Sequence, residues 1–163
     1  MIQKVTLQEL PYFVRNVLAV IGMQSLDAAQ GKATIVALRG ELGAGKTTFT
    51  QALARELGIA EPLQSPTYVL MKSYPIAFTN PFPGIEGRFD RLVHIDAYRL
   101  NSAKEFAALK PEQFLQDPKA LVVVEWPEKV GAALPEPDIT VVFSSENAAE
   151  GERFVEMQSG GQE

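Results

Sequence analysis

The sequence predicts an α/β domain of three layers, in which a mixed, mainly parallel β-sheet carries helices on both faces. Two observations support this prediction. Short apolar runs alternate with amphipathic segments along the chain, and a glycine-rich turn joins one such run to one such segment. The 163 residues, of which 46% are hydrophobic, are ordinary for one globular domain.

The first predicted elements are a helix, a strand and a second helix. Thr6 and Glu9 match a Thr-x-x-Glu capping box, which is typical of the start of a helix. Ala33–Leu38 is a short apolar run that favours a buried strand. Lys46–Leu57 has one apolar face and is followed by Gly58 as a C-terminal stop. The apolar stripe of the first helix consists of Leu10, Phe13, Val14, Val17, Leu18 and Ile21.

The rest of the chain alternates strands with short helices. Residues 75–90 are rich in Pro, Gly and Asn and predict a loop or hairpin insertion. Residues 1–158 are expected to form a single domain and residues 159–163 a flexible tail. The remaining strands are expected at Tyr68–Tyr74, Leu92–Asp96, Leu121–Glu125 and, as an antiparallel pair, Ile139–Phe143 and Arg153–Met157; the short helices are expected at Ser102–Leu109 and Pro111–Leu115.

Composition excludes several kinds of site. The chain has no cysteine, which rules out disulfides, thiolate metal ligands and a cysteine nucleophile. Its net charge of −5 does not favour a polyanion, so contact with nucleic acid would need a local patch or a partner protein. The first residues lack a signal-peptide pattern, and no apolar stretch is long enough to span a bilayer. We therefore expect a cytoplasmic protein.

Residues Gly40–Thr47 match the phosphate-loop pattern G-x-x-x-x-G-K-[ST] in full. In such a loop the backbone N–H groups surround a phosphate, and the following helix adds its dipole to the anion site. Lys46 would supply a charge to the phosphates and Thr47 a hydroxyl ligand to Mg²⁺. A chance glycine turn is the alternative, but the strand before and the helix after are the context that the motif requires. We therefore expect a three-layer P-loop NTPase domain that binds and hydrolyses a nucleoside triphosphate.

Two predicted strands end in an acid, Asp96 and Glu125. In P-loop enzymes an acid on a neighbouring strand holds Mg²⁺ or its waters, and ligands of open α/β sheets gather at the carboxyl ends of strands. Both acids also suit an ordinary turn. His94, the only histidine, should share a strand face with Asp96, and it fits a core position equally well.

Ser65-Pro66-Thr67 lies between the P-loop helix and the next predicted strand. Nucleotide switches order such a segment through contacts with the γ-phosphate and Mg²⁺. The same residues fit a simple turn, and the two interpretations stay open at this point.

Four segments in this order resemble the TsaE family, which comprises bacterial ATPases required for threonylcarbamoyladenosine formation in tRNA. A P-loop alone is shared by very many proteins, whereas the ordered set is much more specific. The similarity extends from about Thr6 to Phe143. Its carrying segments are Gly40–Thr48, Ser65–Tyr68 (S-P-T-Y), His94–Leu100 (H-I-D-A-Y-R-L) and Val124–Pro127 (V-E-W-P).

The resemblance implies roles for individual residues. Thr67 would be the switch threonine and, with Asp96 and Glu125, would form the catalytic set. The same two acids and Thr47 would organise Mg²⁺. Trp126 would lie beside the nucleotide, with a core aromatic as the alternative. His94, Tyr98 and Arg99 belong to the family motif without a separate step assigned to each. The full set implied to bind ATP is Gly40, Glu41, Leu42, Gly43, Ala44, Gly45, Lys46, Thr47, Thr48 and Trp126.

The resemblance also implies two partner proteins, TsaB and TsaD, which bind tRNA and transfer the threonylcarbamoyl group. This chain would then supply ATP turnover, weak alone and dependent on the partners, and would meet tRNA only through the complex.

Two other functions stay open. A small-molecule P-loop kinase usually closes an arginine-bearing lid over the phosphates, but no arginine occurs between Arg99 and Arg153. A nucleotide-switched assembly factor with incidental hydrolysis would use the same groups as an ATPase.

Residues 75–90 depart from the family pattern by their length. One interpretation is a surface hairpin insertion, since loops tolerate added length at little entropic cost. The other is a species-specific contact surface, which exposure of Phe78, Phe82 and Phe89 would favour.

Overall fold

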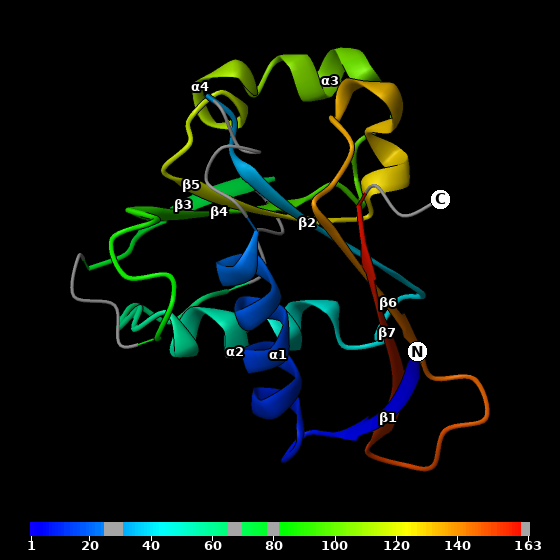
Figure 1. The fold of residues 1–163 in the computed structure, drawn as a ribbon. Helices are drawn as coiled ribbons and strands as arrows, with labels where there is room; N and C mark the ends of the chain where they lie inside the picture. Colours follow the sequence, from blue (N-terminus) through cyan, green and yellow to red (C-terminus); the bar gives the residue numbers. More distant parts are fainter. Residues whose placement is uncertain (25–30, 65–69, 78–81, 161–163) are drawn as a thin grey trace.

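The computed structural model describes residues 1–24, 31–64, 70–77 and 82–160. Its strands form one sheet in the order β1-β7-β6-β2-β5-β4-β3 (Figure 1). The strands are β1 (Ile2–Thr6), β2 (Thr34–Gly40), β3 (Met71–Pro75), β4 (Arg91–Asp96), β5 (Ala120–Glu125), β6 (Ile139–Ser144) and β7 (Glu152–Ser159). The helices are α1 (Leu10–Met23), α2 (Lys46–Glu56), α3 (Ala103–Ala107) and α4 (Glu112–Leu115), with 3₁₀ turns η1 (Pro127–Lys129) and η2 (Gly131–Ala133).

The sheet is mixed, with its parallel strands in the centre. Strands β6, β2, β5 and β4 are parallel neighbours, while β3 at one edge and β7 and β1 at the other pair antiparallel. The central strands read as apolar runs because both of their faces are covered. The predicted α/β fold with a mixed sheet is therefore confirmed.

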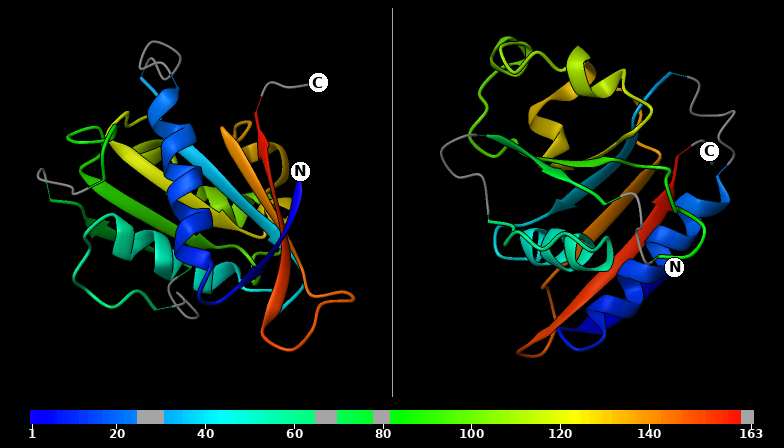
Figure 2. Two further views of the ribbon diagram at one scale, coloured as in Figure 1. Left: turned by 60° about the horizontal axis from the view of Figure 1, so that its bottom comes forward. Right: turned by 90° about the vertical axis from the view of Figure 1, so that its left-hand side faces the viewer.

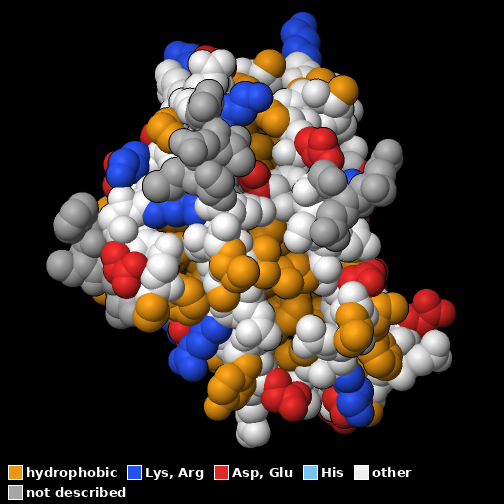
Figure 3. Space-filling view, viewed as in Figure 1, with side chains coloured by type: hydrophobic (Ala, Val, Ile, Leu, Met, Phe, Trp, Pro, Cys, Tyr) orange, Lys and Arg blue, Asp and Glu red, His pale blue; other side chains and the backbone are white. Residues whose placement is uncertain are grey.

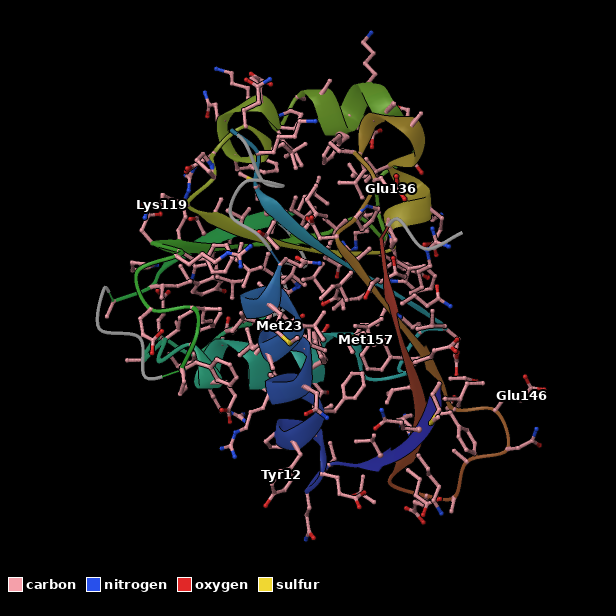
Figure 4. The ribbon with its side chains drawn as sticks, in the orientation of Figure 1. Tyr12, Met23, Lys119, Glu136, Glu146 and Met157 are labelled. Carbon is pink, nitrogen blue, oxygen red and sulfur yellow. The ribbon has the colours of Figure 1, made fainter. Side chains whose placement is uncertain are left out.

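Helices cover both faces of the sheet (Figure 2), and a hydrophobic core lies on each face. Val36 and Val123 pack with α1 and α2, whereas Val122 and Val124, one position away, pack with α3 and α4 on the opposite face. The alternation follows from the two-residue period of a strand. Figure 3 shows apolar side chains between α1 and strands β6 and β7, and Figure 4 places Met23 and Met157 on this side.

The start of the chain follows the capping box and adds one strand. The backbone N–H of Thr6 donates to Glu9 Oε2 at 2.9 Å, and the N–H of Glu9 donates to Thr6 Oγ1 at 3.3 Å. The regular helix begins only at Leu10. The sequence does not predict strand β1. Val5 is its only buried residue, so this edge strand lacks the alternation of apolar and polar residues that is typical of strands.

The connection between β3 and β4 is more than a surface loop. Ile76, Ile85 and Phe89 are buried in the core beneath α1 and α2, and Phe82 packs against that core. The contact-surface interpretation is therefore wrong for Phe89, which is 2% exposed. Phe78 lies outside the described residues. A composition rule could not show this, because Pro and Gly mark where the chain turns and not which side chains turn inward.

Arg88 links the β3–β4 connection to the end of α1 by hydrogen bonds. Its guanidinium donates to the carbonyl oxygen of Ile21 and, at 3.3 Å, to that of Gln24. The carbonyls of the last helical turn lack their full set of intrahelical partners, so a half-buried cation is well placed there. Burial lowers the pKa of Arg88, and the charge of Asp138 opposes this shift.

Replacing Arg88 with methionine should lower the free energy of unfolding by about 1–2 kcal/mol, because two carbonyls lose a charged donor. A urea titration measures the change. Arg55→Met, an exposed arginine of α2, is the matched control and should change stability by less than about 0.5 kcal/mol. Equal stability of the Arg88 variant and the wild type would show that this cap contributes nothing measurable.

The tail was predicted to begin at residue 159, but the structure is regular up to residue 160. Strand β7 continues through Ser159, which pairs with Ile139, and the N–H of Gly160 donates to the carbonyl of Asp138 at 2.7 Å. These ladder contacts hold two residues that were expected to be flexible; residues 161–163 are outside the described part. None of the helices in the described ranges combines the length and apolarity needed to cross a bilayer.

Candidate functional site

The P-loop leaves the carboxyl end of β2 and leads directly into α2. Two of its glycines are required by geometry. Gly45, just before α2, has a φ of +109°, which side-chain-bearing residues rarely adopt. At Gly40, a Cβ atom would lie 2.5 Å from the carbonyl oxygen of Phe143 in β6. The loop shape therefore depends on the motif residues themselves.

The ammonium of Lys46 lies buried inside its own loop. Its Nζ donates to the carbonyl oxygens of Gly40 and Glu41, both at 2.7 Å, and lies 4.2 Å from the ring centroid of Trp126. Burial lowers the pKa of Lys46, and the charge of Glu125 is the largest opposing influence. An anion bound at the loop would offset the cost of keeping this cation out of water.

Glu125 joins two elements at the end of β5. The hydroxyl of Thr47, in the first turn of α2, lies 3.0 and 3.1 Å from the two carboxylate oxygens. His94 of β4 places its Nε2 at 2.8 Å from Oε1 of the same carboxylate. Glu125 is 3% exposed and His94 is fully buried. Parallel pairing of β5 with β2 and β4 brings these side chains together at one edge of the sheet.

Asp96 lies directly opposite Glu125 in the β4–β5 pairing. Its Oδ1 accepts the N–H of Tyr98 at 3.1 Å, as a turn aspartate does. The same side chain also lines the cavity described below, so the turn contact leaves Asp96 accessible from that cavity.

Trp126 has a left-handed backbone, with φ of +59° and ψ of +54°. This conformation is unusual for a large side chain, and such strain is found at functional sites. The ring lies over Lys46, and its centroid is 5.0 Å from that of Tyr98. Trp126 is therefore in contact with the ammonium of Lys46.

A cavity of about 220 Å³ brings most of the expected residues together. The P-loop and α2 contribute Leu42, Gly43, Gly45, Lys46, Thr47 and Thr48. The strand ends contribute Asp96, Tyr98, Glu125 and Trp126.

A second cavity of about 230 Å³ adjoins the same loop and was not expected from the sequence. Gly43, Gly45 and Thr48 line both cavities. The far wall of the second cavity is mostly apolar and includes Leu10 of α1 and Phe143 of β6. No local pattern could have shown it, since its walls come from both ends of the chain.

Three expected residues differ from this arrangement. Gly40 and Glu41 line neither cavity and offer their carbonyls to Lys46. The carboxylate of Glu41 instead accepts from the hydroxyl and the N–H of Ser145, and the hydroxyl bond is the main cause that lowers its pKa. This ties the P-loop to the projecting β6–β7 connection, on which Glu146 is labelled in Figure 4. Ala44 lines the second cavity.

Thr67 lies outside the described residues. The first described residue after that gap is Leu70, whose carbonyl accepts the N–H of Asp96 at 2.9 Å. The chain therefore approaches β3 beside one of the two acids.

Comparison with known proteins places the chain in a family. The family model described as Threonylcarbamoyl adenosine biosynthesis protein TsaE matches residues 16–155. A protein of Treponema pallidum named tRNA threonylcarbamoyladenosine biosynthesis protein TsaE is 36% identical over 122 residues, which are 75% of this chain and 79% of that protein. Proteins of the same name from Synechocystis and Haemophilus influenzae are 41% and 36% identical over 60% and 68% of this chain. The matched part spans 56% and 62% of the length of these two relatives.

The fold is also shared with a solved structure. The crystal structure of YdiB from Bacillus subtilis superposes with a TM-score of 0.64, covering 99% of this chain and 86% of that chain at 22% identity. This likeness concerns the fold alone. The family match, the relatives and the P-loop cavity agree with the resemblance seen in the sequence, and the chain belongs to the TsaE family.

Proposed function

We propose that this chain binds ATP with Mg²⁺ beside the P-loop, hydrolyses it, and thereby serves threonylcarbamoyladenosine formation on tRNA. The observation that carries the proposal is the meeting of an ammonium, a hydroxyl and two carboxylates at one cavity, from Lys46, Thr47, Asp96 and Glu125. Phosphoryl transfer in P-loop enzymes depends on this set of groups for positioning and charge stabilisation.

The two cavities suit the two halves of a nucleotide. The phosphates would lie against the backbone N–H groups of the loop and the N-terminus of α2, which favours anions. The apolar wall of the second cavity, with Leu10 and Phe143, suits a nucleoside base, because small-molecule pockets are lined mainly by apolar side chains. Thr48 lines both cavities and so would lie between the two halves of the nucleotide.

The oxygen donors fit Mg²⁺, which prefers one or two carboxylates together with phosphate oxygens and water. Thr47 and Glu125 would hold the ion, with Asp96 lining the same cavity as a second carboxylate. Bound there, the ion would neutralise charge on the phosphate oxygens.

In hydrolysis a water oxygen bonds to the γ-phosphorus, the bond from that phosphorus to the bridging oxygen breaks, and ADP and phosphate leave. Lys46 would stabilise charge that develops on the phosphate oxygens. Glu125 would orient the attacking water and take up its proton. The role of Thr67 as the switch threonine stays a prediction that rests on the resemblance.

We propose TsaB and TsaD as the partners, on the strength of the family. ATP turnover should be slow for the chain alone and should rise when both purified partners are added, with tRNA as a further addition. Steady-state phosphate release is measured for the chain alone and for the chain with both partners, each with and without tRNA. The partnership would be contradicted if the ATPase rate did not change when both partners were added and if a strain depleted of this protein kept its level of modified tRNA. Partner assembly that needs ATP but not its hydrolysis would favour the nucleotide-switched assembly factor.

A further inference from the structure

His94 is a buried polar side chain with one hydrogen bond to the described part of the chain. It is fully buried in β4, its Nε2 lies 2.8 Å from Glu125 Oε1, and its Nδ1 has no hydrogen-bond partner among the described residues. Buried polar groups normally find partners, so a histidine left half-satisfied in a core needs an explanation. Among the described residues, Glu125 is the polar group that its Nε2 reaches.

The direction of this hydrogen bond follows from the chemistry of the two groups. An ionised carboxylate accepts hydrogen bonds and cannot donate, so opposite an ionised Glu125 the Nε2–H of His94 is the donor.

Thr47 and His94 constrain Glu125 in different ways. The Thr47 hydroxyl lies 3.0 and 3.1 Å from the two carboxylate oxygens and therefore does not distinguish them. His94 contacts Oε1 alone. The Thr47 contact fixes the position of the carboxylate, and the His94 contact fixes its rotation. Oε2 therefore makes no hydrogen bond to His94.

We propose that His94 is a positioning residue that sets the orientation of the Glu125 carboxylate, a role that rests on the function proposed above. The Thr47 hydroxyl would have two tasks, as a ligand to the metal ion and as a donor to Glu125, whereas His94 contacts Glu125 through Nε2 alone. Groups that hydrogen-bond to a carboxylate at a metal site typically affect affinity or activity by 10- to 100-fold when removed.

Two substitutions separate positioning from packing. In His94→Leu the side chain keeps a similar size but becomes apolar and cannot donate, so kcat should fall by about 10- to 100-fold while the KM for ATP changes by less than about threefold. In His94→Gln the amide nitrogen can take the place of Nε2 and donate, so much of kcat should return. Val93→Ala, on the opposite face of β4, is the control for lost stability without contact to Glu125.

A second readout needs no turnover. Titration of Mg²⁺ into each protein with ADP, followed by calorimetry, should show that His94→Leu needs about 10-fold more Mg²⁺ than the wild type, with His94→Gln in between. If His94→Leu behaves like Val93→Ala in kcat and in Mg²⁺ dependence, the positioning role is overturned and His94 is a core residue. A wild-type protein without Mg²⁺-dependent turnover would instead overturn the proposed function, and this role with it.

Discussion

Lys46→Ala should weaken ATP binding by about 100-fold or more, because the loop loses the buried cation that would contact the phosphates. Each hydrogen bond from a charged donor contributes about 1.5–3 kcal/mol, and a lysine at this position can make more than one to phosphate oxygens. The ammonium is held at 2.7 Å from two loop carbonyls, so its place in the loop is set before the nucleotide arrives. Isothermal titration calorimetry measures the dissociation constant directly.

Two variants accompany this experiment. Lys46→Met keeps the apolar stem beneath Trp126 but removes the charge, so it should lose as much affinity as Lys46→Ala with less disturbance of packing. Lys104→Ala removes an exposed lysine of α3, on the other side of the sheet, and should bind ATP as the wild type does. Unchanged affinity in folded Lys46→Met would contradict the assignment of Gly40–Thr47 as a nucleotide loop.

Glu125→Ala should reduce turnover far more than nucleotide affinity. If Glu125 positions Mg²⁺ and the attacking water, its loss should lower kcat by about 100-fold or more. The dissociation constant for ATP should change by less than about fivefold, because the P-loop contacts remain. Glu125→Gln should behave similarly in kcat while retaining an acceptor for His94 and Thr47, which keeps the surrounding structure intact. Single-turnover phosphate release and calorimetry separate the two quantities.

Glu128→Gln is the matched control for the charge alone. Glu128 is exposed, lies three residues further along the chain, and acts on Lys46 only through its charge. Its replacement should change kcat by less than about threefold, as expected for a screened surface charge. If both Glu125 variants lost turnover and ATP affinity equally, Glu125 would have a structural role and would not position Mg²⁺ and water.

Much of the fold is encoded locally and could be predicted. The strand β5 follows from a run of valines, α2 from an apolar face that ends at Gly58, and the P-loop from glycines whose backbone angles other residues rarely adopt. Each of these signals lies within a dozen residues, because strand and helix periodicity and loop geometry act over that range. The edge strand β1 and the buried Phe89 could not be predicted, because both depend on what packs against them.

The sequence by itself determined that this chain has a P-loop and acids at two strand ends, since a motif and a period need only neighbouring residues. Only the tertiary structure decided which groups meet. Thr47, His94 and Glu125 come from α2, β4 and β5, and the packing of these elements brings Thr47 and His94 within hydrogen-bond distance of Glu125. In the same way the left-handed turn at Trp126 places an aromatic ring over Lys46, a contact between residues 80 positions apart that no local pattern specifies.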